Sequence, residues 1–287
     1  MGFRTVVVSS HSKLEYSLNY LVFKTVDEVK RINISEIQTL IIESTAVSIT
    51  SALLVELMKQ KIKVIFCDEK KNPNSELVPY YGDSISYKRV CEQINWDIQI
   101  KSEVWKIIVQ EKIKQQAYVL SKINKEESKI LLEYASDVVD GDLTNREGHA
   151  AKYYFNRVFG EGFTRNSSDM KNIYLNYGYS LILSQINRCI VSKGYLTQLG
   201  IHHKNATNQF NLSCDLMEPF RPIIDNKILM IDEKNFKDDL VNLLTENVII
   251  SGQKQTLANA ISIYCSSVFA ALTSGDLRQI KFVEKYE

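Results

Sequence analysis

Three stretches far apart in the chain hold the side chains that could do metal chemistry. Glu147 lies in DLTNREGHAAKYYF at 142–155, and two neighbouring histidines, His202 and His203, follow much later. Asp215 and Glu218 come next in CDLMEPF, three residues apart and therefore on one face of a predicted helix. Carboxylate and imidazole donors together suit Mg²⁺ or Mn²⁺, and the imidazole favours Mn²⁺. We therefore predict that Glu147, one histidine and Glu218 meet at a divalent cation.

Each of these groups also has a plainer interpretation. Thr144 and Glu147 form a T-x-x-E capping box, in which both side chains satisfy backbone N–H groups at a helix start. The acids at 215 and 218 fit a solvated pair, or acids opposing a helix dipole. The adjacent histidines fit an exposed loop, and only one of the two can point at a given site. Taken alone, Glu147 is better explained as part of a cap.

The surroundings of the acidic pair favour the metal interpretation. Apolar neighbours indicate a mostly buried segment, namely Leu212, Leu216, Met217 and Phe220. Buried acids need partners or a metal ion. No thiolate cluster accompanies them, so the pattern does not predict a structural zinc site. Walker, G-x-G-x-x-G, G-x-S-x-G and H-E-x-x-H motifs are all missing from the sequence.

Composition limits the partners of the protein. The 287 residues carry 35 Lys and Arg against 34 Asp and Glu, so any DNA contact must come from local patches. One candidate is a basic stripe between residues 87 and 125, for which a merely solvated helix face is an equally good explanation. Its basic members are Lys88, Arg89, Lys101, Lys106, Lys112, Lys114, Lys122 and Lys125.

Five scattered cysteines without a C-x-x-C pair fit reduced thiols in a cytoplasmic protein. The N-terminus lacks a signal-peptide pattern, and no apolar run approaches the length that spans a bilayer. We therefore predict a soluble protein of the cytoplasm.

Hydrophobic periodicity predicts an α+β fold in two domains. Residues 1–76 read as a small, mostly β domain with one helix at 50–60 and a linker at 68–76. A hairpin turn is predicted around Asn19. Residues 77–287 read as a larger, all-α domain, in which one β-strand is also predicted at 248–253. Its predicted helices lie at 87–95, 97–124, 126–139, 147–158, 168–193, 213–218, from 222, 235–247 and 256–273.

The three stretches, in this order, resemble the CRISPR-associated integrase/endonuclease family, Cas-one, of spacer acquisition. The matching segments are NREGHAAKYYF at 145–155, LGIHHKNATNQFN at 199–211 and SCDLMEPFRPIID at 213–225. The resemblance runs over essentially the whole chain. The opening RTVVVSSHSKLEY and VIFCD at 64–68 are similar to the type II-A branch. The family's order of β domain, linker and helical domain agrees with the order predicted from the pattern.

Carried over residue by residue, the resemblance implies that Glu147, His203 and Glu218 are the metal ligands and the catalytic residues, with Mg²⁺ or Mn²⁺ as cofactor. Asp215 is the second acid of its motif and is implied to support the ligands. Further supporting residues are implied at Asn145, Arg146, His202 and Arg221.

The implied function is integration of DNA, with associated endonuclease activity. The 3′-hydroxyl ends of a short duplex, the prespacer, attack phosphodiesters at a CRISPR repeat. The implied partners are double-stranded DNA, a second copy of the chain, and the small protein Cas-two in a heterohexamer. The type II-A effector nuclease and a ring-shaped DNA-end-binding protein are also implied. Two alternatives stay open, a structure-selective nuclease for branched DNA and a non-catalytic DNA-binding scaffold.

Overall fold

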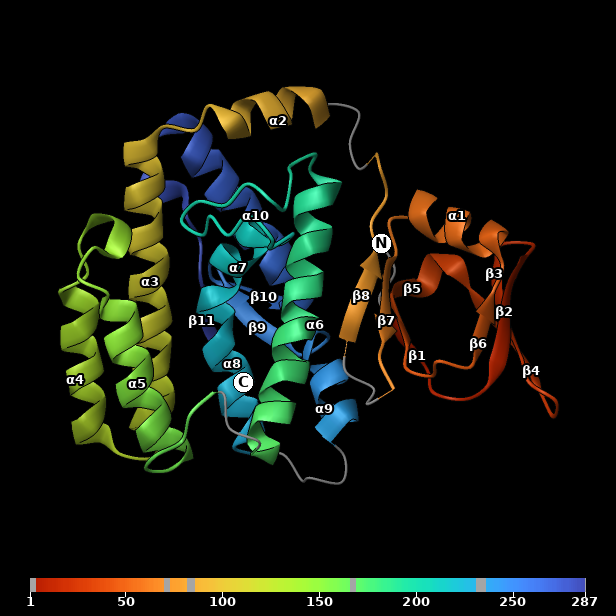
Figure 1. Ribbon diagram of the computed structural model, residues 1–287, viewed down its shortest axis with the longest axis horizontal. Helices are drawn as coiled ribbons and strands as arrows, with labels where there is room; N and C mark the ends of the chain where they lie inside the picture. Colours follow the sequence, from red (N-terminus) through yellow and green to blue (C-terminus); the bar gives the residue numbers. More distant parts are fainter. Residues whose placement is uncertain (1–3, 70–72, 82–85, 166–168, 231–235, 287) are drawn as a thin grey trace. The chain divides into compact units, whose positions relative to one another are not determined.

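The computed structural model describes residues 4–69, 73–81, 86–165, 169–230 and 236–286. The chain forms two compact units, which are described separately. The first comprises Met1–Ser84 with Val191–Lys193, and the second comprises Ile85–Ile190 with Gly194–Glu287. Figure 1 follows the chain from the strand-rich first unit into the mostly helical second unit.

Two four-stranded sheets make up most of the first unit. One has the order β1-β5-β7-β8, with β1, β5 and β7 parallel and β8 antiparallel at its edge. Its strands are β1 (Arg4–Val8), β5 (Ile37–Ile42), β7 (Lys63–Cys67) and β8 (Pro73–Leu77). The other has the order β4-β3-β2-β6, formed by β4 (Val29–Asn33), β3 (Tyr20–Lys24), β2 (Ser12–Ser17) and β6 (Val47–Ile49). A short 3-10 turn, η1 (Ile34–Glu36), and one helix, α1 (Ser51–Lys59), complete this unit.

Local sequence signals account for much of this unit. Leu18 and Asn19 both have positive φ, at 48° and 65°, which is the backbone of a two-residue hairpin turn between β2 and β3. Thr50 caps α1 by accepting the backbone N–H of Leu53. The predicted hairpin and helix are therefore confirmed. The predicted linker at 68–76 is wrong in part, because Pro73–Leu77 forms β8 and pairs with β7.

The second unit contains nine of the helices described in the chain. They are α2 (Ser86–Ile94), α3 (Ile98–Ser121), α4 (Lys125–Ser136), α5 (Arg146–Phe159), α6 (Met170–Ser192), α7 (Asn211–Met217), α8 (Arg221–Ile228), α9 (Phe236–Leu243) and α10 (Leu257–Ser274). Three short 3-10 turns lie between them, at η2 (Asp140–Asp142), η3 (Glu218–Phe220) and η4 (Leu277–Gln279). The turn η3 continues α7 directly into α8, so Glu218 lies where the two helices meet.

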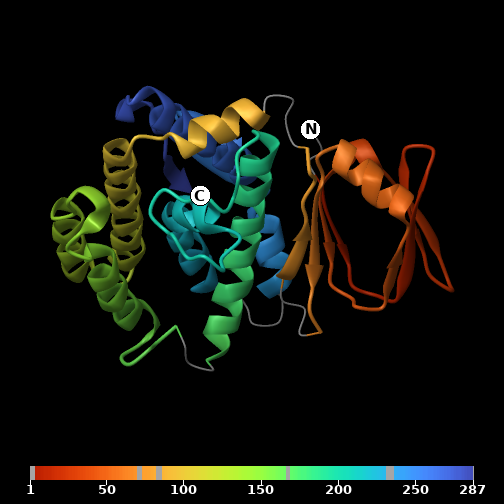
Figure 2. The ribbon, with the colours of Figure 1, turned by 45° about the horizontal axis from the view of Figure 1, so that its top comes forward.

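Helix α3 is the central support of the second unit. It packs against α4 and α5 on one side and against α7, η3, α8 and α10 on the other, as both ribbon views show (Figures 1 and 2). Asp97 caps its start by accepting two backbone N–H groups. Because α3 has neighbours on two sides, ten of its 24 residues are buried. Lys112 is the one charged residue among them.

The sequence predicted an all-α second domain with one strand, but the second unit contains a three-stranded sheet. Strands β9 (Asn247–Ile250), β10 (Gln253–Thr256) and β11 (Val283–Tyr286) form an antiparallel sheet in the order β10-β9-β11, and α10 packs on it. Two strands, β9 and β10, thus form a hairpin where one strand was predicted at 248–253. The third strand, β11, comes from the end of the chain and pairs with β9. The α+β fold class, with a strand-rich N-terminal region and a helical C-terminal region, is confirmed.

Helix α10 corrects the expectation about apolar runs. Among the described residues it is the one helix that is long and apolar enough to cross a membrane by length and composition. However, 61% of it is buried inside the protein, and the core helix of a soluble protein passes the same test. This is weak evidence for a membrane span.

Candidate active site

Glu147 and Glu218 share one cation, the ammonium group of Lys112. Lys112 Nζ donates to Oε1 of Glu147 at 2.6 Å and also donates to Oε2 of Glu218. The three residues come from α5, η3 and α3, and the Lys112 and Glu218 side chains are almost fully buried. The structure therefore brings together the two glutamates that the sequence predicted to meet.

Lys112 is the site residue that sequence reasoning assigned wrongly. It was placed in a solvated or DNA-binding basic stripe, whereas its side chain is buried against two carboxylates. Burial alone would lower the pKa of Lys112, but the charges of Glu218 and Glu147 raise it above its usual value. A signal was present, because Lys112 lies seven residues after Trp105 and four after Ile108, on the apolar face of α3.

Other members of the basic stripe are paired within the protein. Lys106 donates to Asp140 at 3.1 Å, and Arg89 donates to Glu92 at 2.8 Å. Lys122 donates to the side-chain oxygen of Asn226 at 2.9 Å. These contacts engage part of the stripe in local structure.

Side chains other than Glu147 cap the start of α5. Asn145, not Thr144, is the N-cap of α5, and its side chain accepts from the backbone N–H of Gly148 at 3.3 Å. The carboxylate of Asp142 accepts the backbone N–H groups of Arg146 at 2.8 Å and of Glu147 at 3.0 Å. The predicted capping box is therefore wrong. Because other side chains satisfy this helix start, the Glu147 carboxylate is available to Lys112.

Arg221 fixes the other oxygen of Glu218. Its Nε donates to Oε1 of Glu218 at 2.8 Å, one helical turn along the chain. Burial favours the protonated form of Glu218, but the positive charges of Arg221 and Lys112 prevail and lower its pKa to about 2. Both carboxylate oxygens of Glu218 thus carry a charged hydrogen bond, and the group is ionised.

Arg221 is itself held by an aromatic support. Its guanidinium lies 4.7 Å from the ring centre of Tyr179, whose hydroxyl donates to Oδ1 of Asp225. Arg165 lies 5.1 Å from the same ring centre. Asp225 is buried, and burial raises its pKa to about 6 against the opposing effects of Tyr179 and the two arginines. This chain of contacts extends the site from Glu218 into the core.

Asp215 orients His203. Nδ1 of His203 lies 2.5 Å from Oδ1 of Asp215, which is completely buried. The hydrogen bond to Asp215 raises the pKa of His203, and the more distant charges of Glu218 and Glu147 add to this effect against burial. With Nδ1 engaged, Nε2 is the ring nitrogen left to face a ligand. Asp215 thus lies behind the histidine, which is a supporting position.

His202 has a different environment. Its ring stacks flat on the buried Trp105 of α3, with ring centres 4.5 Å apart and planes 4° from parallel. His203 meets the same indole edge-on at 5.7 Å. The structure therefore separates the two adjacent histidines, one packed on an aromatic ring and one held by a carboxylate.

The donor set fits a divalent cation in chemistry. The carboxylates of Glu147 and Glu218 already bind one positively charged group, the ammonium of Lys112. Beside them lies the imidazole of His203, whose orientation is set by Asp215. Oxygen donors with one imidazole suit Mg²⁺ or Mn²⁺. In the described part of the chain, however, no three His, Cys, Asp or Glu side chains lie close enough together to hold a metal ion. The structure thus brings the glutamates together at Lys112 and leaves His203 bound to Asp215.

Arg146 does not reach this cluster. It pairs with Asp137 at 3.4 Å, and its guanidinium lies 5.8 Å from the ring centre of Tyr134. Both partners belong to the α4 region, so Arg146 joins α5 to α4. Five residues were implied to support the ligands, and Arg146 is the one placed away from them. Asp215 holds His203, Arg221 contacts Glu218, Asn145 caps the helix of Glu147, and His202 packs on Trp105.

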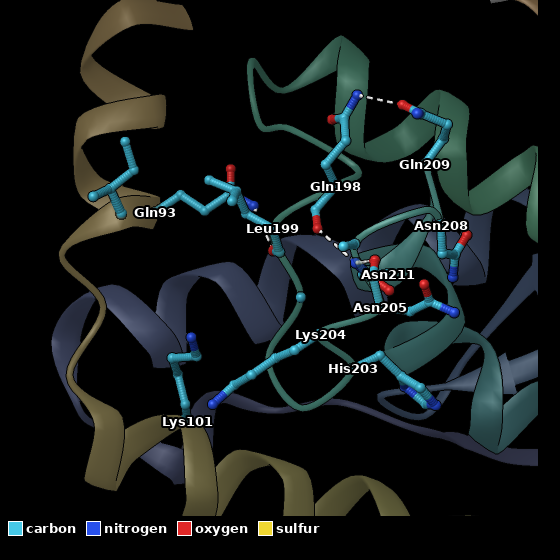
Figure 3. A pocket seen from close by; sticks show the side chains of 13 residues that line it. Gln93, Lys101, Gln198, Leu199, His203, Lys204, Asn205, Asn208, Gln209 and Asn211 are labelled. Atoms are coloured by element: carbon cyan, nitrogen blue, oxygen red, sulfur yellow. Dashed lines mark hydrogen bonds between the residues drawn. The ribbon is translucent and has the colours of Figure 1, made fainter.

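A cavity of about 410 Å³ lies next to His203 (Figure 3). Amide side chains line much of it, namely Gln93, Gln198, Asn205, Asn208, Gln209 and Asn211. Lys101 and Lys204 reach the same corner of the cavity. Burial and the charge of Lys204 lower the pKa of Lys101. Two neighbouring lysines at a cavity lined by amide side chains can bind an anionic group.

Sequence comparison relates the chain to one family. Residues 5–257 match the model of the family described as CRISPR associated protein Cas1. The CRISPR-associated endonuclease Cas1 of Neisseria meningitidis serogroup C (strain 8013) is 31% identical over 294 residues, which cover 99% of this chain and 97% of that protein. The CRISPR-associated endonuclease Cas1 1 of Francisella tularensis subsp. novicida (strain U112) is 26% identical over 260 residues, covering 83% and 81%.

Solved structures share the fold. A casposase bound to an integration product superposes with a TM-score of 0.79 at 20% identity, covering 96% of this chain and 92% of that one. A CAS1 protein from Thermotoga maritima has a TM-score of 0.76 at 17% identity, covering 94% and 97%. A Cas6-RT-Cas1–Cas2 complex has a TM-score of 0.75 at 16% identity, covering 96% of this chain and 36% of that one.

Proposed function

This chain belongs to the Cas1 family, and we propose that it is a metal-dependent DNA integrase of CRISPR spacer acquisition. It joins the 3′-hydroxyl ends of a short DNA duplex to repeat DNA by transesterification, and it cuts DNA in an associated endonuclease reaction. The relatives named endonucleases support the cutting reaction, and the casposase with its integration product supports the joining reaction on this fold.

The observation that carries the proposal is the single cation shared by Glu147 and Glu218 beside an oriented histidine. Two carboxylates close together would repel an approaching DNA phosphate unless a cation lay between them. We propose that Glu147, Glu218 and His203 hold Mg²⁺ or Mn²⁺. When bound, such an ion would lower the pKa of the attacking hydroxyl and neutralise charge on the transferring phosphate.

The other residues of the site act by positioning the metal ligands and the DNA. Such positioning supplies most of the catalysis in phosphoryl transfer. Asp215 holds the ring of His203 in one orientation through Nδ1. Arg221 holds one oxygen of Glu218 and keeps that carboxylate ionised. Lys101 and Lys204, at the cavity beside His203, bind a DNA phosphate and bring the scissile bond to the carboxylates.

Assembly with other molecules is part of the proposal. The partners are double-stranded DNA, a second copy of the chain and Cas2, and a Cas1–Cas2 complex among the matching structures supports the last. The type II-A effector nuclease and the ring-shaped DNA-end-binding protein remain predictions that follow from the type II-A resemblance.

The test is a strand-transfer assay on supercoiled repeat DNA with a labelled short duplex and Mn²⁺ or Mg²⁺. Wild-type protein should give products that carry joined label. Glu147→Ala should abolish joining while duplex binding and dimerisation persist, because the Glu147 side chain is half-buried and Lys112 keeps Glu218 as a partner. Undiminished joining by that variant would contradict the proposed site.

The same assay separates the alternatives. A structure-selective nuclease would cut branched DNA and leave no joined label. A non-catalytic scaffold would do neither and would be unaffected by Glu147→Ala.

A further inference from the structure

Lys112 binds one oxygen of each glutamate that is proposed to hold the divalent cation. Oε1 of Glu147 and Oε2 of Glu218 both accept from Lys112 Nζ. Oε1 of Glu218 is bound to Arg221, so it does not replace Oε2 as a free donor. Because both oxygens of Glu218 are engaged, an ion that bridges the two glutamates must take Oε2 of Glu218 from Lys112.

The charges of this cluster are balanced without a metal ion. Glu147 and Glu218 contribute two negative charges, and Lys112 and Arg221 contribute two positive charges. All four are linked by direct ion pairs, with both Lys112 and Glu218 buried. Buried ions are tolerated when they are paired and hydrogen-bonded, and a buried pair that loses one partner is strongly destabilised. The charges of this cluster are therefore paired with one another without a metal ion.

We propose that Lys112 is a built-in competitor of the divalent cation, holding Glu147 and Glu218 in a metal-free resting form from which the ion must displace it. This inference rests on the metal-dependent function proposed above. A monovalent ammonium and a divalent ion repel each other at close distance in a low-dielectric site, so both do not occupy the space between the carboxylates.

Competition by Lys112 also explains why the three proposed metal ligands do not surround a common point. The two glutamates are spaced by the ammonium group between them, and His203 faces Asp215 at their side, so no three ligand groups close on one point in the described structure. Removal of Lys112 from the gap would let the carboxylates and His203 approach a common ion. The apparent metal affinity is lower than the intrinsic affinity by the fraction of protein in the open form.

The experiment is Lys112→Met, which keeps the length and apolar stem of the side chain and removes the ammonium group. Binding of Mn²⁺ to the full-length protein is measured by calorimetry without DNA, and thermal unfolding is followed with and without Mn²⁺. In metal-free buffer the variant should melt several degrees below wild type, because two carboxylates lose their cation. Its Mn²⁺ affinity should rise about tenfold, as for a resting form that is about 90% populated. Its gain in melting temperature on adding Mn²⁺ should exceed that of wild type.

Two further variants sharpen the result. Lys106→Met removes a lysine six residues earlier on the same helix, where it pairs with Asp140. It should leave the Mn²⁺ affinity unchanged. Lys112→Arg retains the charge and should bind Mn²⁺ no more tightly than wild type. If Lys112→Met does not fold, Lys112→Arg still tests the inference, because a gain in Mn²⁺ affinity with the charge retained would contradict it.

Equal or weaker Mn²⁺ binding by Lys112→Met would overturn the inference, as would a tenfold gain in affinity for Lys112→Arg. Absence of Mn²⁺ binding by both wild type and Lys112→Met would also overturn it. These outcomes are distinct from failure of the proposed function. Wild type could show the predicted competition and still join no DNA, or join DNA while Lys112→Met shows no gain in affinity.

Discussion

The carboxylate of Asp215 holds both the ring of His203 and the backbone that leads to it. Its Oδ1 lies 2.5 Å from Nδ1 of His203 and accepts the backbone N–H of the same residue at 3.1 Å. Its Oδ2 accepts the backbone N–H groups of Ile201 at 2.6 Å and of His202 at 3.0 Å. A Cβ atom at Gly200 would lie 2.8 Å from Oδ2, so glycine lets this loop approach the carboxylate. Asp215 therefore folds the histidine loop as well as orienting one ring.

Asp215→Asn should weaken metal binding by about 10–100-fold, the usual loss when the group that orients a metal-binding histidine is altered. The amide presents a donor where the carboxylate accepts, which disturbs either His203 or the loop backbone. Calorimetric titration with Mn²⁺ measures the effect. Asp137→Asn, at an exposed acid that pairs with Arg146, is the matched control and should bind Mn²⁺ as wild type does. Wild-type affinity in Asp215→Asn would contradict the orienting role.

The two adjacent histidines should differ in their effects on strand transfer. His203→Ala should reduce joining more than about 100-fold, comparable to loss of one transition-state contact. His202→Ala removes a ring stacked on Trp105 and should cost about 1 kcal/mol of folding stability while most joining activity remains. Parallel joining assays and urea unfolding of both variants check this. An inactive His202→Ala with an active His203→Ala would assign the ligand to the other histidine.

The start of α5 should respond to changes at Asn145 and not at Thr144. Asn145 caps the helix with φ 51° and ψ 44°, a left-handed conformation that few side chains adopt. Asn145→Ala should lose about 1 kcal/mol of unfolding free energy, while Asn145→Gly should lose only a few tenths, because glycine tolerates positive φ. Thr144→Ala should change stability by less than about 0.5 kcal/mol. Urea denaturation of the three variants measures this, and a larger loss for Thr144→Ala would restore the capping box.

Asp225 should make stability depend on pH. Its pKa of about 6 in the folded protein exceeds the ordinary value of 3.8, so the folded state binds this proton more tightly than the unfolded chain. Its contribution to stability is then present at low pH and is lost as the pH rises from about 4 to about 6. Asp225→Asn cannot ionise and keeps an oxygen for the Tyr179 hydroxyl. Relative to wild type, it should gain on the order of 2 kcal/mol over that interval.

Thermal or urea unfolding at several pH values between 4 and 7 checks this prediction. Glu161→Gln, at an exposed acid, is the control and should follow the wild-type curve. A constant difference between Asp225→Asn and wild type across the interval would show that Asp225 does not titrate there.

Local features of the fold could be predicted from the sequence because short-range geometry decides them. The turn at Leu18 and Asn19, the cap at Thr50 and the start of α3 after Asp97 each depend on side chains within four residues. Strand β8 was missed because charged and turn-forming residues precede it, and its pairing with β7 depends on a neighbour that the local pattern does not show. The β11 strand, paired with β9 from the end of the chain, was missed for the same reason.

By itself the sequence determined the order of the three motifs, which was sufficient for the family, and it selected the two glutamates that the structure brings together. Only the tertiary structure decided which cation lies between them. Lys112 is 35 residues from Glu147 and 106 from Glu218, and its periodic position on α3 shows burial without showing a partner. Hydrophobic periodicity encodes which face of a helix is covered, whereas the packing of α3 against α5 and η3 determines which charges meet there. The identity of the buried partner is thus a property of the assembled core.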